Sequence, residues 1–113
     1  MDERGPVMAK YLVVASYTAE GIKGVVSKGG TARRDAVAKM AADLGGTVES
    51  FYFGFGEGDA YVVIDLPDNV AAAAVGLAVS ASGMASTKTI VLLTPDEIDR
   101  AVKTNVAYKA PGA

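Results

Sequence analysis

Hydrophobic residues along this chain occur in two kinds of segment, some with the pattern of β-strands and some with the spacing of α-helices. Four short runs are rich in β-branched and aromatic residues, which strands favour. They predict strands at residues 10–17, 47–55, 59–66 and 86–94. A short turn that contains glycine separates the second run from the third, so these two strands are expected to form a hairpin.

The segment between the first two strands has apolar residues at helical spacing and predicts two consecutive helices. Thr18 is placed as the N-cap of the first helix, which is expected to end at Gly29 and Gly30. Thr31 is placed to cap the second helix, which is expected to end at Gly45. We therefore expect one helical excursion that is broken near Gly30.

Two further helices are expected in the second half of the chain. The first has Asp68 or Asn69 as its N-cap and ends at Gly83. The stretch TPDEIDRAV, residues 94–102, has a threonine N-cap, proline at the first helical position and a glutamate placed for a capping box. This stretch predicts a C-terminal helix.

The order of the predicted elements is β-α-β-β-α-β with a C-terminal helix, which is the ferredoxin-like pattern of the α+β class. Right-handed crossovers place both main helices on one face of a four-stranded antiparallel sheet. The strands are apolar at both parities, as Leu12 and Val14 against Tyr11 and Val13 illustrate. Both faces are therefore expected to be covered. A second subunit's sheet is the simplest cover for the helix-free face, which predicts a dimeric α+β barrel.

Composition supports an oligomer and excludes several kinds of chemistry. The chain has 113 residues, half of them hydrophobic, and a mean hydropathy of +0.27. This length predicts one domain, and a subunit interface is a natural place for its excess apolar residues. A formal charge of −2 argues against nucleic acid as a partner, because phosphate binding requires a basic face.

The absence of cysteine and histidine narrows the chemistry further. Without cysteine the chain has no disulfide, thiolate nucleophile or zinc–thiolate site. Without histidine it lacks the commonest transition-metal ligand, an axial histidine for heme, and the side chain best suited to acid–base work near neutral pH. No acidic loop resembles a calcium site. We therefore expect neither a metal nor a cofactor.

The organisation expected along the chain is simple. Residues 1–8 are predicted to be a disordered N-terminal extension, residues 9–104 one domain, and residues 105–113 an irregular tail. The N-terminal residues do not have the basic stretch and long apolar run of a leader. The apolar stretch at 70–85 is short for a bilayer span. We expect a cytoplasmic protein with no membrane partner.

Three ordered segments resemble the GYD domain family. They are AKYLVVASYTAEGIKGVVSKGGTARRDAVAKMAADLGG, FYFGFGEGDAYVVIDLPDNVAAAA and TKTIVLLTPDEID, which together cover roughly residues 9–101. The resemblance implies a small bacterial protein of the dimeric α+β barrel group. It implies little about chemistry, because the family is largely uncharacterised.

The family takes its name from a Gly, Tyr, Asp signature near the predicted hairpin. Gly56 and Asp59 match this signature, but Gly58 stands where the tyrosine is expected. Any chemistry that relatives draw from that tyrosine is therefore in doubt for this chain. Tyr61 has the same strand parity as Asp59 and is a candidate replacement.

The hairpin sequence FYFGFGEGDAYVV supports two interpretations. Alternation places Phe51, Phe53 and Phe55 on one face of the sheet. In the first interpretation they fill the core or a dimer interface, as aromatic residues in sheets commonly do. In the second they wall a ligand pocket. Asp59 either bonds nearby backbone amides after the glycine-rich turn or acts as a general base whose pKa is raised by apolar surroundings.

The stretch GGTARRD supports a second binding hypothesis. Arg33 and Arg34 fall in the first turn of a predicted helix, where free amides, the helix dipole and guanidinium groups can together hold a carboxylate or phosphate. Alternatively, both arginines are ordinary solvated helix residues. The glycines of the chain form no Walker or dinucleotide-binding fingerprint.

Two classes of function remain open. The first is an oligomeric protein that binds a small apolar or aromatic ligand without catalysis. The second is a cofactor-free enzyme, similar to a monooxygenase or an isomerase, that acts on a small aromatic substrate; this analogy rests on fold alone. The expected partners are further copies of the chain, as a homodimer or larger homo-oligomer, and a small-molecule ligand.

The predicted ligand site lies between the helices and the hairpin. In the ferredoxin-like order the first and third strands are antiparallel neighbours, so the end of the first lies beside the start of the third. This topology brings Tyr17 and Asp59 together. No catalytic residue is assigned, and the predicted ligand-binding residues are Tyr17, Arg33, Phe55, Asp59 and Tyr61.

Overall fold

The computed structural model describes residues 8–112. Its strands are β1 (Ala9–Tyr17), β2 (Thr47–Phe53), β3 (Ala60–Leu66) and β4 (Ala85–Leu92). Its helices are α1 (Ala19–Lys28), α2 (Gly30–Asp43), α3 (Asn69–Ala81) and α4 (Pro95–Lys103). Residues 1–7 of the expected N-terminal extension and residue 113 of the expected tail lie outside the described residues.

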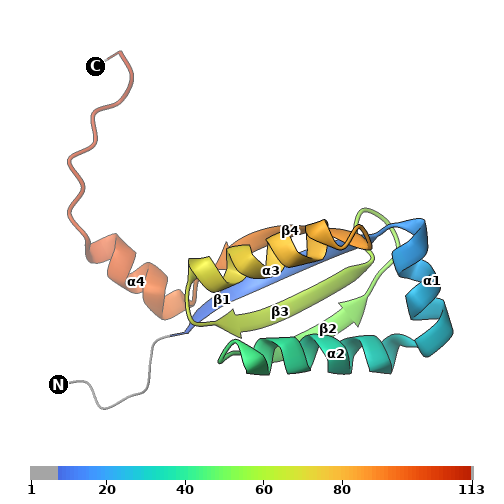
Figure 1. Ribbon diagram of the computed structural model, residues 1–113. Helices are drawn as coiled ribbons and strands as arrows, with labels where there is room; N and C mark the ends of the chain where they lie inside the picture. Colours follow the sequence, from blue (N-terminus) through green and yellow to red (C-terminus); the bar gives the residue numbers. More distant parts are fainter. Residues whose placement is uncertain (1–7, 113) are drawn as a thin grey trace.

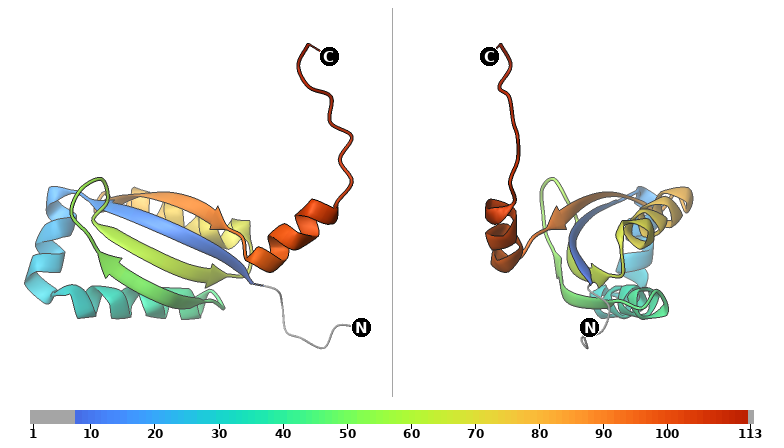
Figure 2. Two further views of the ribbon diagram at one scale, coloured as in Figure 1. Left: turned by 180° about the vertical axis from the view of Figure 1, so that it is seen from behind. Right: turned by 90° about the vertical axis from the view of Figure 1, so that its left-hand side faces the viewer.

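The four strands form one antiparallel sheet in the order β2-β3-β1-β4. Helices α2 and α3 lie across one face of this sheet, and α1 stands at one end (Figure 1). Seen from behind, the opposite face has none of the described helices across it (Figure 2). The predicted α+β, ferredoxin-like fold is therefore confirmed, whereas the dimeric barrel stays a prediction.

Two of the predicted strands are too long at their C-terminal ends. The second strand ends at Phe53, two residues early, because the Gly54 N–H donates to the Asp59 carbonyl at 3.0 Å and closes the hairpin there. Residues 54–59 then form a loop that joins β2 to β3. The last strand ends at Leu92, two residues before the predicted end.

Three of the four predicted helix caps are confirmed, and one is wrong. The side chains of Thr18 and Asp68 accept hydrogen bonds from the N–H groups of Gly21 and Ala71. Thr31, however, does not cap α2, which already begins at Gly30. Gly29 ends α1 and also precedes α2, and its φ of 88° lies in the left-handed region that glycine tolerates. This one-residue break places Thr31 inside the first turn of α2.

The core lies between the sheet and the covering helices. Tyr11 and the inward-facing residues of β3 are almost fully buried against α2 and α3, whose buried contributions are Ala41, Ala72 and Val75. The hydroxyl of Tyr11 donates to Asn69 Oδ1 at 2.6 Å, so this buried polar group has a partner. Burial, with a smaller contribution from the charge of Asp68, raises the pKa of Tyr11.

The helix-free side of the sheet, which we call the open sheet face, has an apolar row at its centre. Strand pairing aligns Leu12 with Val63 on one side and with Ile90 on the other, so an apolar row crosses three strands. The other apolar residues on the open sheet face are Val14, Tyr52, Tyr61 and Leu92. At one end of this face, Lys10 forms ion pairs with Glu49 and Asp65, and these hydrogen bonds raise the pKa of Lys10.

Helix α4 extends past the end of the sheet, on the side away from α2 and α3 (Figure 2). It buries none of its side chains against the described chain, and Ile98 and Val102 are exposed. Its start is nevertheless well capped. The predicted capping box is present, because Thr94 Oγ1 accepts from the Glu97 N–H at 3.1 Å and the Thr94 N–H donates to Glu97 Oε1 at 2.9 Å.

We expect Thr94→Ala to destabilise α4 by about 1 kcal/mol, because the N-cap hydrogen bond is lost. Amide exchange of residues 95–101 should become about fivefold faster. The pKa of Glu97 is lowered, chiefly by its hydrogen bond from the Thr94 backbone. The hydrogen bond from the Thr94 N–H to the Glu97 carboxylate should therefore be fully formed at neutral pH and weaken as the pH falls through that lowered pKa. Equal amide exchange of residues 95–101 in Thr94→Ala and the wild type would contradict the predicted loss of stability.

Candidate functional site

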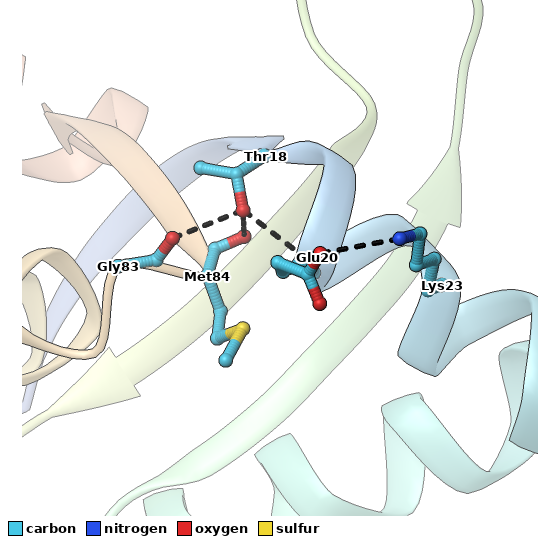
Figure 3. Close-up of polar contacts among 6 residues, drawn as sticks. Thr18, Glu20, Lys23, Gly83 and Met84 are labelled. Carbon is cyan, nitrogen blue, oxygen red and sulfur yellow. Dashed lines mark hydrogen bonds and ion pairs between the residues drawn. The ribbon is translucent and has the colours of Figure 1, made fainter.

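The start of α1 is fastened to the turn between α3 and β4 through Thr18 (Figure 3). The Thr18 N–H donates to the Met84 carbonyl at 2.9 Å. Its hydroxyl donates to the Gly83 carbonyl at 3.0 Å, with the Met84 carbonyl at 3.2 Å as a second acceptor. The same oxygen accepts from the Gly21 N–H at 3.2 Å. These bonds hold the first turn of α1 against the end of the sheet.

This placement of α1 forms one wall of a half-open cavity of about 620 Å³, the outer cavity, between α1, α2 and the end of α3. Its lining is predominantly apolar and includes Gly24, Val25, Ala36, Met40, Val79 and Met84. The charged residues Glu20, Lys28 and Arg33 also line it. Small residues at helix positions leave this space unfilled; they are Gly24, Ala32, Ala36 and Ala78. A glycine inside a helix costs about 1 kcal/mol relative to alanine, so Gly21 and Gly24 each lower the intrinsic stability of α1.

A smaller space of about 90 Å³, the inner cavity, lies between the helices and the sheet. It is lined by core side chains such as Val13, Phe51 and Val62. Both cavities share a set of lining residues, namely Tyr17, Arg33, Ala36, Met40 and Val79. The two spaces are therefore neighbours, and these shared residues lie between them.

Arg33 is the charged side chain common to both cavities. It is half-buried, its Nε donates to the Tyr17 hydroxyl at 3.4 Å, and its Cζ lies 5.7 Å from the centre of the Tyr17 ring. Such a stacked guanidinium is attracted by the face of the ring. Within residues 8–112 no carboxylate forms an ion pair with Arg33, whereas the neighbouring Arg34 pairs with Asp35 at 3.1 Å. Arg33 therefore presents an unneutralised positive charge beside apolar space.

Asp59 lies beside Tyr17, as the topology predicted, but the two meet through the backbone. Asp59 Oδ2 accepts from the Tyr17 N–H at 2.9 Å, and the Asp59 N–H donates to the Ala15 carbonyl at 2.8 Å. Asp59 belongs to the lining of neither cavity. These contacts fasten the hairpin loop to the end of β1 and leave the Tyr17 hydroxyl to Arg33.

The remaining predicted site residues lie away from the cavities. Tyr61 pairs with Val14 and Tyr52, which places it on the open sheet face, opposite Tyr17. Phe55 lies in the hairpin loop and is fully exposed. Phe51 and Phe53 face the helices with ring centres 5.2 Å apart. The structure therefore brings Tyr17, Arg33 and Asp59 together and separates Tyr61 and Phe55 from them.

The family model of the GYD domain matches residues 11–102, which is most of the chain. The chain belongs to the GYD domain family. No curated protein and no solved structure gave a match. The resemblance found in the sequence is thus confirmed at the level of the family.

The signature region of this GYD protein has a structural reason for glycine at position 58. Gly58 is buried, and a Cβ there would lie 2.4 Å from Val14 Cγ1 and 3.1 Å from the Tyr61 hydroxyl. Any side chain at this position would collide with Val14. The Tyr61 hydroxyl thus occupies space beside the position where the family's tyrosine is expected.

Across residues 8–112, no three acidic side chains lie close enough together to hold a metal ion. Over the same part of the chain, every helix is too short or too polar to cross a bilayer.

Sequence reasoning missed the helical residues of the outer cavity. The sequence patterns single out neither Met40 nor Val79, which line both cavities. The available signal was the pair Gly21 and Gly24 in α1, because small residues three apart place a bare strip along one helix face.

Proposed function

We propose that this GYD protein is a homo-oligomeric α+β barrel protein that binds a small apolar or aromatic ligand without catalysing a reaction. The observation that supports ligand binding is the outer cavity, whose volume of about 620 Å³ falls in the range of small-molecule sites. Its apolar lining favours a ligand that removes apolar surface from water, at about 25 cal/mol for each Å² buried. A cytoplasmic location stays a prediction of this proposal.

The open sheet face supports the oligomeric part of the proposal. Leu12, Val63 and Ile90 form an apolar row with none of the described helices across it. A second copy can cover this row with its own, because a two-fold interface pairs the same patch on both subunits. Helix α4 lies on the same side of the sheet (Figure 2), where a partner subunit would be within its reach.

The alternative, a cofactor-free enzyme for a small aromatic substrate, has less support. It requires a carboxylate or hydroxyl that faces a substrate in an apolar pocket. The Asp59 carboxylate is bonded to the Tyr17 backbone and lies outside both cavity linings. Tyr17 does line both cavities, but its hydroxyl accepts a hydrogen bond from the Arg33 guanidinium. Binding without chemistry is therefore the better explanation of this geometry.

The binding proposal can be tested with 4-phenyl-1-butanol, an uncharged compound with an aromatic ring and a short chain. We expect it to shift the amide NMR signals of residues that line the outer cavity, in α1, α2 and the end of α3. Ala36→Leu should weaken binding about tenfold, which corresponds to about 1.4 kcal/mol, because the longer side chain occupies ligand space.

The matched control is Ala42→Leu, which makes the same change at an exposed α2 position outside both cavities. It should leave the affinity for 4-phenyl-1-butanol unchanged. An absence of shifts at cavity residues up to the solubility limit of the compound would overturn the binding proposal. Equal weakening by both substitutions would also contradict it, since the effect would then not depend on the cavity.

A further inference from the structure

We infer that the ligand of the outer cavity is an amphipathic carboxylate, whose carboxylate binds Arg33 and whose apolar body lies in the outer cavity. This inference rests on the proposed function and narrows it to one class of ligand. It depends on the juxtaposition of one unneutralised guanidinium with two adjoining apolar spaces.

The position of Arg33 is unfavourable for a charge without a partner. Taking a charged group out of water is costly unless an opposite charge or hydrogen bonds compensate it. Arg33 is half-buried in the first turn of α2, and among residues 8–112 only the Nε of its side chain has a hydrogen-bond partner. A bound anion would supply the missing compensation, and the positive end of the α2 dipole would reinforce it.

The geometry of Arg33 also favours a carboxylate in particular. A guanidinium has five N–H donors, and the Tyr17 hydroxyl uses the one on Nε. The four N–H groups on the two Nη atoms remain for a ligand. A carboxylate accepts two parallel hydrogen bonds from such a group, and this bidentate, charge-assisted pair is stronger than bonds between neutral groups. The Tyr17 ring, 5.7 Å from Cζ, holds the guanidinium plane in place.

The apolar spaces determine the rest of the ligand. From Arg33 the outer cavity continues along the bare strip of α1 to Val25 and Met84. In the other direction, the inner cavity reaches the core at Val62 and Val75. A ligand with its carboxylate at Arg33 can therefore place an aromatic or aliphatic body against the apolar lining of the outer cavity. A fully polar anion, such as a sugar acid, would leave these surfaces without an apolar partner.

The test compares three compounds of the same shape: 4-phenylbutyrate, 4-phenyl-1-butanol and 4-phenylbutylamine. Isothermal titration at neutral pH should give the tightest binding for the carboxylate, by about tenfold over the alcohol. The amine should bind more weakly than the alcohol, because its positive charge faces Arg33. Arg33→Gln should remove the preference for the carboxylate while leaving the affinity for the alcohol within about threefold.

Arg34→Gln is the matched control, because Arg34 is the next residue in the same helix turn but pairs with Asp35 and lies outside both cavities. It should leave all three affinities unchanged. Arg33→Lys is a second variant, which keeps the charge but not the planar pair of donors, and it should retain only part of the preference. Thermal unfolding of each variant checks that the fold is intact.

The outcomes separate the inference from the proposed function. If the wild type binds the alcohol as tightly as the carboxylate, the inference is overturned and the proposed function stands. If Arg34→Gln weakens carboxylate binding as much as Arg33→Gln, the effect reflects overall charge, and the inference is again overturned. If none of the three compounds binds at the cavity, the proposed function itself fails.

Discussion

Leu12→Asp is expected to convert a dimer into monomers that keep their secondary structure. Leu12 lies in the middle of the open sheet face, beside Val63 on β3 and Ile90 on β4. In the proposed two-fold interface the substitution places two carboxylates in an apolar contact. The expected loss of affinity between subunits is at least about 100-fold, or about 2.7 kcal/mol. Sedimentation velocity at about 10 μM would detect this change.

Val70→Asp provides the control for this experiment, because Val70 is equally apolar but lies exposed in the first turn of α3, away from the open sheet face. It should leave the sedimentation coefficient at the dimer value. Circular dichroism should be unchanged in both variants, since the core lies on the other face of the sheet. A wild-type protein that sediments as a monomer would show that the sheet-to-sheet dimer is wrong.

The order of the elements and most helix starts could be predicted because their signals are local. The caps at Thr18, Asp68 and Thr94 depend only on groups within one helical turn, and all three form as expected. Thr31 has the same local signal and does not cap a helix. A single glycine at φ 88° both ends α1 and begins α2, so the helix starts before Thr31 is reached. A capping signal within one helical turn does not predict the start of a helix when the preceding helix ends at the same residue.

The candidate site could be predicted only in part. Topology alone brings Tyr17 beside Asp59, since antiparallel neighbours place the end of one strand at the start of the other. Topology does not decide which atoms meet, and the Tyr17 N–H satisfies the Asp59 carboxylate in place of the hydroxyl. Tyr61 lies on the opposite face because it pairs with Val14, whose strand parity differs from that of Tyr17. The alternation of β1 already contained this information.

The outer cavity depends on where α1 stands, and no pattern in the sequence specifies that position. Its position is determined by the contacts of Thr18 with Gly83 and Met84, which lie more than sixty residues away in the chain. The spacing of glycines along α1 shows that one face of the helix has small residues, but it does not show whether that face meets a neighbouring element or empty space. Long-range contacts of this kind require the tertiary structure.

Gly21 and Gly24 show whether a small residue of α1 meets a neighbour or empty space. Substitution by alanine should have opposite effects on stability at the two positions. A Cβ on Gly21 would lie 1.9 Å from the Met84 carbonyl oxygen, a backbone atom that cannot move without its turn. Gly21→Ala should therefore push α1 away from the α3–β4 turn and weaken the bonds of Thr18. We expect a net loss of about 1–3 kcal/mol in the free energy of unfolding, despite the better helix propensity of alanine.

Gly24→Ala is the matched change one turn later, where a Cβ would meet nothing within 4 Å. Here only the helix propensity acts, so the free energy of unfolding should rise by up to about 1 kcal/mol. Urea unfolding measures both free energies of unfolding. A fixed protein concentration keeps any contribution from subunit association the same in every measurement. The Gly21→Ala protein should also bind 4-phenyl-1-butanol more weakly, since moving α1 changes one wall of the outer cavity. Stabilisation by both substitutions would mean that α1 is not held against Met84, and the cavity would then lack that wall.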